Sequence, residues 1–287
     1  MVRLWEVVTG KERSQIKVPF RGPEMMRDAR QTEIACVAFS ADSQSLILGK
    51  TDGTVSIWSL PLAKETRVMP AHRDRVVSVA MSADGKTFAT GSWDTTALIW
   101  DATNVVRRQR SKPAGLTAQE REALWTDLAS PDASRAYRAM WNLMEEPEDC
   151  LPFVKGRMKP IPKVEAGRIA QLIENLENDK FTVREQATTE LNMLGEVALP
   201  LLRKAMAGQL SLEGRRRIEK LLDTFGGPVP PPEALRALRA VEMLEHIGTP
   251  EARQALHAVS QGAPEARLAQ DANASLKRLE KRAPASP

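Results

Sequence analysis

His72, Ser92 and Asp94 are residue types that could form a nucleophilic triad, in which a carboxylate orients an imidazole that activates a hydroxyl. A serine nucleophile on a strand-to-helix turn lies in a Gly-x-Ser-x-Gly motif, and the sequence contains none. Gly49-Lys50-Thr51 is similar to the end of a phosphate-binding loop, but Gln44 occupies the position of the first glycine. Both constellations are therefore rejected, and the sequence predicts no enzyme.

Residues that bind metals or cofactors are scarce. The chain has three histidines, His72, His246 and His257, and two cysteines, Cys36 and Cys150, which lie far apart in the sequence. Zinc sites built from cysteine need closely spaced pairs such as Cys-x-x-Cys, and the sequence has none. We therefore expect no metal, no cofactor and no small-molecule substrate, and we interpret both cysteines as small buried apolar residues.

Positive charge is concentrated before residue 111, where 16 Lys and Arg residues stand against 12 Asp and Glu; the difference equals the chain's net charge of +4. The densest run is Arg107, Arg108, Arg110 and Lys112. Nucleic-acid-binding proteins usually gather such charge on one folded face, so we interpret this run as a solvated linker and do not expect a nucleic-acid partner. Arg215-Arg216-Arg217 could bind an acidic or phosphorylated segment, but it is more typical of the solvated face of a helix.

The elements that would position these residues repeat at an offset of 42. At this offset Asp42, Asp52 and Trp58 fall on Asp84, Asp94 and Trp100. Each copy contains a β-prone apolar run, a polar turn and a further β-prone run that ends at the tryptophan. Short strands between Gly and Asp turns are typical of antiparallel sheets, and a period of about 40–45 residues is that of a four-stranded propeller blade.

The second copy resembles a WD repeat. Trp100-Asp101 is the WD dipeptide, and Ala71-His72 stands where the family usually has Gly-His. The resemblance implies a hydrogen-bonded tetrad of His72, Thr90, Asp94 and Trp100 that locks the blade. Buried polar groups need partners, and these four side chains would provide them for one another.

The first copy departs from the WD pattern. Arg30 and Leu48 stand at its His and Thr positions, so only Asp52 and Trp58 remain of the tetrad, and we expect this blade to be the less rigid. Trp93, just before the tetrad aspartate of the second copy, is a possible partner contact because interfaces are rich in tryptophan. Packing against a neighbouring blade is the alternative.

Val2–Glu6 resembles the end of the third strand of a still earlier blade. The chain would then hold about two and a third blades, fewer than the roughly four to eight that close a ring. An open propeller leaves unpaired strand edges, which favour aggregation. We therefore expect the chain to be the C-terminal part of a longer protein.

From Leu116 onward the apolar spacing becomes helical. Thr117-Ala118-Gln119-Glu120 is a capping box, and Ser130-Pro131 is expected to open the next helix. An apolar stripe runs from Ile169 to Leu176. Prolines at 152, 160 and 162 are interpreted as marks of a connector, and further helices are predicted at 180–195, 196–207, 211–225, 233–247, 250–260 and 264–281.

Residues 179–195 resemble the first helix of a HEAT-type repeat, and 235–252 resemble the bacterial HEAT-like variety. WD repeats followed by such a helical block are similar to planctomycete-type WD-repeat proteins. The resemblance implies a multidomain fold, β then α, in which an incomplete WD-repeat β-propeller precedes an all-α HEAT-like domain. The expected boundaries are 1–109 for the propeller segment, 110–115 for a linker, 116–282 for the helical domain and 283–287 for a disordered tail.

Both repeat types are mainly binding platforms, so the resemblance implies a noncatalytic interaction or scaffold protein whose partner is another protein. The alternative is a C-terminal accessory fragment of a larger multidomain enzyme or signalling regulator. No apolar run in the sequence reaches the length of a membrane span, and Met1–Glu6 lacks the pattern of a signal peptide. Because the N-terminus is expected to be truncated, these absences leave the compartment unassigned.

Overall fold

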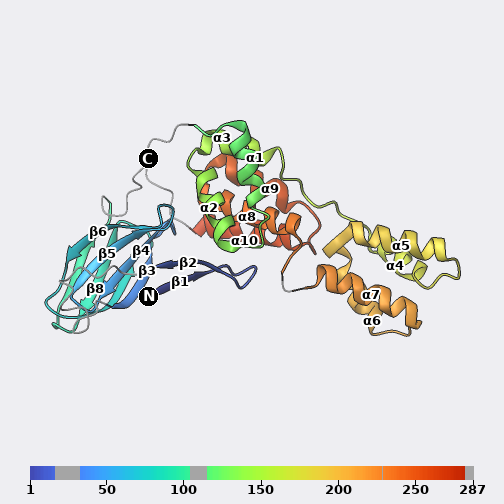
Figure 1. Cartoon of the computed structure of the whole chain (residues 1–287), viewed down its shortest axis with the longest axis horizontal. Coiled ribbons are helices and arrows are strands. Elements are labelled where there is room, and N and C mark those ends of the chain that lie inside the picture. Colours follow the sequence, from blue (N-terminus) through green and yellow to red (C-terminus); the bar gives the residue numbers. More distant parts are fainter. Residues whose placement is uncertain (17–32, 104–114, 228, 282–287) are drawn as a thin grey trace. The chain divides into compact units, whose positions relative to one another are not determined.

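The computed structural model describes residues 1–16, 33–103, 115–227 and 229–281. The chain divides into two compact units, with the main division between Leu116 and Thr117. The first, called the β unit, contains the strands, and the second, called the helical unit, contains the helices (Figure 1). Arg30, the basic run from Arg107 to Lys112, the predicted linker apart from Gly115, and the predicted tail lie outside the described residues.

Nine strands of the described chain form three antiparallel sheets. The hairpin pairs β1 (Val2–Trp5) with β2 (Glu12–Ile16). Blade B is a four-stranded meander of β3 (Ile34–Phe39), β4 (Ser45–Lys50), β5 (Thr54–Ser59) and β6 (Lys64–Pro70). Blade C is a three-stranded meander of β7 (Val76–Met81), β8 (Thr87–Ser92) and β9 (Ala97–Asp101). The chain thus begins with a WD-type β region, and its described strands do not close a ring.

Blades B and C repeat each other strand by strand. The pairs Ile34 with Lys50 and Val76 with Ser92 lie 42 residues apart, and the same register shift follows each. The two blades share a core, in which Gly49 of blade B lies so close to Val76 of blade C that a Cβ atom at residue 49 would come within 2.7 Å of a Val76 methyl group. A glycine is needed at this position because only its bare Cα leaves room for the next blade.

Ten α-helices and one 3₁₀ helix make up the described part of the helical unit. They are α1 (Ala118–Asp127), α2 (Ala133–Met144), α3 (Pro147–Lys155), α4 (Ala166–Asn175), α5 (Phe181–Leu194), η2 (Gly195–Ala198), α6 (Leu199–Met206), α7 (Leu212–Phe225), α8 (Pro232–Ile247), α9 (Pro250–Ser260) and α10 (Arg267–Lys281). None of these described helices is long and apolar enough to cross a membrane.

Most helix predictions agree with the structure, and four need correction. The capping box at Thr117 is confirmed. The next helix begins at Ala133 instead of Ser130-Pro131, because the Asp132 carboxylate accepts hydrogen bonds from two backbone N–H groups of its first turn. The predicted helix 196–207 opens as 3₁₀ and becomes α at Leu199, and the last helix begins at Arg267, not at 264.

The fourth correction concerns α3, which was predicted to be part of a connector. Pro152 lies inside this helix, and Pro147 occupies its first position. An internal proline removes one helical N–H, so it usually ends a helix. Here Cys150 and Val154 are buried on one face of α3, and burial of this face stabilises the helix in spite of Pro152.

Contacts within the helical unit join segments about one hundred residues apart. α2 and α3 pack against α8, and α3 also packs against α9. Arg239 of α8 is buried and donates to the backbone carbonyls of Leu128 (2.7 Å) and Ser130 (2.8 Å), so it satisfies the C-terminal end of α1. α4, α5, α6 and α7 form a second core around Leu191, Leu202 and Ile218, to which Ala263 and Ala266 also belong.

Candidate interaction surface

The structure brings the four predicted tetrad residues of blade C together. His72 Nε2 lies 2.8 Å from Thr90 Oγ1, and Trp100 Nε1 donates to the same oxygen at 2.9 Å. His72 Nδ1 lies 3.2 Å from Asp94 Oδ2. The His72 side chain is fully buried and Thr90 is 2% exposed, so these bonds replace water that neither group can reach.

A proton on Nδ1 of His72 gives each hydrogen bond of the tetrad one donor and one acceptor. Trp100 then donates to Thr90, the Thr90 hydroxyl donates to Nε2, and Nδ1–H faces two acceptors, Thr96 Oγ1 at 2.9 Å and Asp94 Oδ2 at 3.2 Å. Asp94 also accepts from the Thr96 hydroxyl at 2.6 Å and from the backbone N–H groups of Arg73 and Thr96. The Thr96 hydroxyl, followed by the Arg73 and Thr96 N–H groups, holds the pKa of the Asp94 carboxyl well below its usual value.

Trp93 lies on the β8–β9 turn that Asp94 fixes. Its side chain is 64% exposed, and the Arg75 guanidinium lies 5.4 Å from the ring. The Trp93 backbone N–H donates to the Arg75 carbonyl at 3.1 Å. Thr95 adopts a φ of +67°, where a β-branched residue is strained, and the Asp94–Thr96 bonds hold it there. The turn therefore presents an exposed aromatic ring on a fixed backbone.

A depression of about 460 Å³ is lined in part by the tetrad residues His72 and Asp94. Its lining combines apolar, charged and hydroxyl groups, namely Pro70, Ala71, His72, Arg73, Asp94, Thr96 and Leu98. Asp94 is thus shared by the tetrad and by the wall of this depression. The exposed Trp93 ring and a nearby depression are the features that a protein–protein contact uses for an anchor and its pocket.

Blade B carries only part of the tetrad. Asp52 accepts from the backbone N–H and hydroxyl of Thr54, as Asp94 does from Thr96. Among the described residues, however, Trp58 Nε1 is buried without a hydrogen-bond partner, because Leu48 stands where blade C has Thr90. Arg30, at the His position, lies outside the described residues.

The rejected catalytic candidates have structural roles. Lys50 of the loop-like Gly49-Lys50-Thr51 is buried and forms an ion pair with Glu65 at 2.8 Å. The Ser92 hydroxyl donates to the Asp74 carbonyl. Within the described ranges, no group of three or more His, Cys, Asp or Glu side chains is placed to hold a metal ion.

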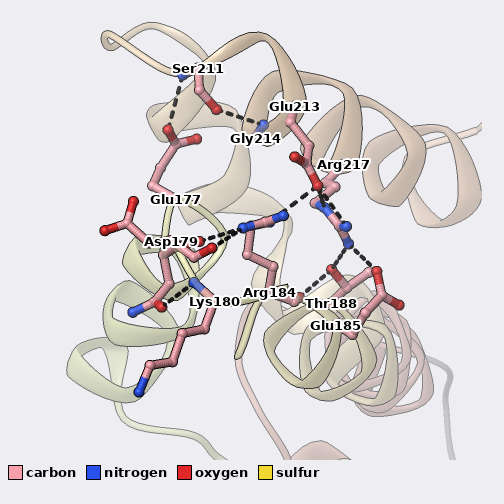
Figure 2. Close-up of polar contacts among 11 residues, drawn as sticks. Glu177, Asp179, Lys180, Arg184, Glu185, Thr188, Ser211, Glu213, Gly214 and Arg217 are labelled. Carbon is pink, nitrogen blue, oxygen red and sulfur yellow. Dashed lines mark hydrogen bonds and ion pairs between the residues drawn. The ribbon is translucent and has the colours of Figure 1, made fainter. Parts of the chain in front are cut away.

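Arg217 of the predicted solvated run is held in a polar network between α5 and α7. It pairs with Glu185 at 2.6 Å and with Glu213 at 2.8 Å, and Arg184 shares Glu213 (Figure 2). These carboxylates already neutralise its charge, so Arg217 is not available to an acidic segment. Cys150 is buried, and this burial raises the pKa of its thiol to about 12.

One surface was missed by the sequence analysis. A groove of about 600 Å³ lies between α3 and the first half of α9. It escaped notice because α3 was taken for a connector, and an exposed face is recognised only after its helix has been assigned. The available signal was the spacing of Pro147 and Leu151, four residues apart, with Lys155 four residues further on.

Comparison with known proteins concerns the β unit. The family model described as WD domain, G-beta repeat (WD40) matches residues 26–59 and 63–101. The curated proteins gave no match. Similar solved structures include U3-55K (26% identity, TM-score 0.26), the WD40 repeats of RRP9 (27%, 0.25) and the β-propeller domain of Cps50 (Swd1) from Myceliophteria thermophila (26%, 0.25). They cover 27%, 27% and 28% of this chain, which spans about a quarter of their length (25%, 25% and 24%). Because the family model matches two successive segments, the chain contains two WD40 repeats.

Proposed function

We propose that this chain is a noncatalytic protein-interaction scaffold, and that the turn carrying Trp93 is a contact surface for a protein partner. WD40 repeats generally mediate protein interactions, and two are present. The observation that carries the proposal is the exposed Trp93 ring on a turn that the His72–Thr90–Asp94–Trp100 tetrad fixes from below. In the helical unit, the HEAT-like interpretation stays a proposal that would add a second binding platform.

Physical reasoning favours a contact role for Trp93 over a packing role. A tryptophan buries a large apolar area for two rotatable side-chain bonds, so ordering it on binding costs little entropy. Its backbone N–H already donates to the Arg75 carbonyl, and the N–H of the next residue, Asp94, donates to the Ser92 hydroxyl, which lowers that cost further. Arg75 beside the ring adds a cation that can meet a carboxylate of the partner.

The experiment compares two exposed tryptophans. Trp93→Ala removes the proposed anchor, and Trp5→Ala removes a tryptophan of similar exposure (55%) from the hairpin. Each chain is immobilised, and proteins retained from lysate of the source organism are quantified by mass spectrometry. We expect at least one protein to be depleted by about tenfold or more with Trp93→Ala, as for an interface anchor, and retained with Trp5→Ala.

Two results would overturn the proposal. One is a set of retained proteins that both substitutions leave unchanged. The other is robust turnover by the purified wild-type chain in a broad activity screen, which would show that the chain is an enzyme.

A further inference from the structure

The groove between α3 and α9 offers an apolar floor to solvent. Its apolar lining comes from Pro147, Leu151 and Pro152 on α3 and from Ala255 on α9. Because 147, 151 and 155 are four residues apart, they form one stripe along the whole length of α3. At about 1.5 Å per residue this stripe is about 12 Å long, which matches about two turns of a bound helix.

The groove also carries unneutralised charge. Glu148 and Glu251 stand in the first turns of α3 and α9 and both line the groove. Neither forms an ion pair within the described part of the chain, whereas the neighbouring Asp149 faces Arg121 at 3.5 Å. Lys155, at the far end of the α3 stripe, is the groove's basic residue.

Pro152 adds an acceptor to the acidic end. In a helix the N–H of residue 152 would donate to the carbonyl of Glu148, four residues earlier, but proline has no N–H. The Glu148 carbonyl therefore lacks its usual helical donor. An approaching cationic side chain would meet two carboxylates beside an apolar floor.

We propose that this groove binds a short amphipathic segment of a partner protein, whose apolar side chains pack on Leu151 and Pro152 and whose Lys or Arg side chain pairs with Glu148 and Glu251. This is the helix-in-groove mode of recognition, with the charges selecting and orienting the segment. The site lies in the helical unit and uses none of the residues of the Trp93 surface. It therefore goes beyond the proposed scaffold role, and a negative result for either surface leaves the proposal for the other unchanged.

The chain's overall charge makes the test selective. With a net charge of +4, the whole molecule attracts acidic peptides and repels basic ones. That excess lies before residue 111, and the remaining residues hold 25 Lys and Arg against 25 Asp and Glu, so a preference for a basic peptide at this groove points to its local carboxylates. The probes are two fluorescein-labelled peptides of about 12 residues, long enough for about three helical turns, one built of Leu and Lys and the other of Leu and Glu at the same positions.

Binding of both probes to the full chain is measured by fluorescence anisotropy. We expect the Leu/Lys peptide to bind wild type about tenfold more tightly than the Leu/Glu peptide, a difference of about 1.4 kcal/mol. The double variant Glu148→Lys/Glu251→Lys should reverse this order. The matched variant Glu219→Lys/Asp223→Lys, which makes the same charge change on exposed residues of α7, should keep it.

Leu151→Asp tests the apolar floor, and we expect it to weaken both peptides. Circular dichroism of every variant checks that the helices remain. The proposal is overturned if neither peptide binds, if both double variants change the preference alike, or if Leu151→Asp leaves binding unchanged while the fold is intact. Should the Leu151→Asp chain lose helicity, Leu151→Ser replaces it and is judged by the same result.

Discussion

Thr90 and Ser56 show how the position of one hydroxyl decides whether the buried polar groups of a blade find hydrogen-bond partners. In blade C, Thr90 lies opposite Leu98 across the β8–β9 pair, and its oxygen bonds both His72 and Trp100. Blade B has the two residue types exchanged, with Leu48 opposite Ser56. The Ser56 hydroxyl is buried and has no hydrogen-bond partner among the described residues. A hydroxyl on the wrong strand is therefore a cost to blade B.

We expect Thr90→Val and Ser56→Ala to change stability in opposite directions. Thr90→Val leaves buried groups of His72 and Trp100 without a partner and should lower the opening free energy of blade C by about 1–3 kcal/mol. Ser56→Ala removes an unsatisfied hydroxyl and should raise the opening free energy of blade B by about 1 kcal/mol. Hydrogen exchange of peptides from β4 and β8 measures both values. A loss of stability in both variants would contradict this assignment.

Acid should weaken the β unit through its turn aspartates. In the native state the pKa of each of three turn aspartates is lowered, chiefly by a hydrogen bond from a nearby hydroxyl. The donors are Ser82 to Asp84, Thr96 to Asp94 and Thr103 to Asp101. Below the usual aspartate pKa of about 4, these carboxylates become protonated in the unfolded chain but stay ionised in the native chain. The free energy of unfolding therefore decreases as the pH is lowered.

The measurement is hydrogen exchange of blade C peptides, corrected for intrinsic exchange, between about pH 5 and about pH 3. We expect protection to fall toward the lower pH, and to fall less in Asp84→Asn/Asp101→Asn, which lacks two of the three carboxylates. A wild-type chain whose protection rises with acid would show that these pKa values are not lowered in the native state.

At the scale of the element, each β-turn is fixed by an aspartate, but the two turns are unequal. Asp52 and Asp94 both accept from a Thr two residues later. Asp94 additionally accepts from the Arg73 N–H and lies 3.2 Å from His72. We therefore predict that Asp94→Ala loosens its blade more than Asp52→Ala does, as seen in hydrogen-exchange protection of the adjoining strands. Equal or reversed losses would count against the tetrad as the stabilising element.

Gly214 tests how the α4–α5 turn is joined to α7. Glu177 accepts from the Ser211 N–H at 3.0 Å, and a Cβ atom at residue 214 would collide with the Glu177 carboxylate (Figure 2). In a Glu177→Ala background, Gly214→Ala should stabilise the chain by about 0.5–1 kcal/mol through helix propensity. With Glu177 present the gain should shrink, because the new methyl displaces the carboxylate from Ser211. Urea unfolding of wild type, the two single variants and the double variant gives the coupling energy between residues 177 and 214. Identical effects of Gly214→Ala in both backgrounds would exclude a contact between these residues.

The elements that the sequence predicted best are those whose local signals agree. The 42-residue offset located the strands of blades B and C, and the Thr117 capping box located the start of α1. The sequence missed α3 because Pro152 is a local signal against a helix, and burial of Cys150 and Val154 overrides it. The α3–α9 groove was lost with it, since its lining comes from segments that only tertiary contacts bring together.

At the scale of the whole molecule, the two units differ in how their apolar surface is covered. The core around buried Leu172, Leu191, Leu202 and Ile218 is filled by residues of the helical unit itself, Ala263 and Ala266 included. In the β unit, β9 is an edge strand of blade C among the described strands, and Ile99 on it is 80% exposed. Unpaired edges with exposed apolar residues favour association.

We therefore expect residues 116–287 alone to be strongly helical, monomeric and cooperatively folded, and residues 1–110 alone to aggregate or stay partly unfolded. Expressing the two segments separately and comparing circular dichroism, thermal melting and sedimentation checks this expectation. A monomeric, cooperatively melting 1–110 would show that the β unit is self-sufficient.

The central claim is that the Trp93 surface contacts a protein partner. Its most direct test is hydrogen exchange of the full chain with and without a partner retained by wild type and lost with Trp93→Ala. We predict new protection in the peptide that spans the β8–β9 turn, residues 92–96, and little change in α4–α7. Protection confined to other parts of the chain, with the turn exchanging as in the free protein, would contradict the claim.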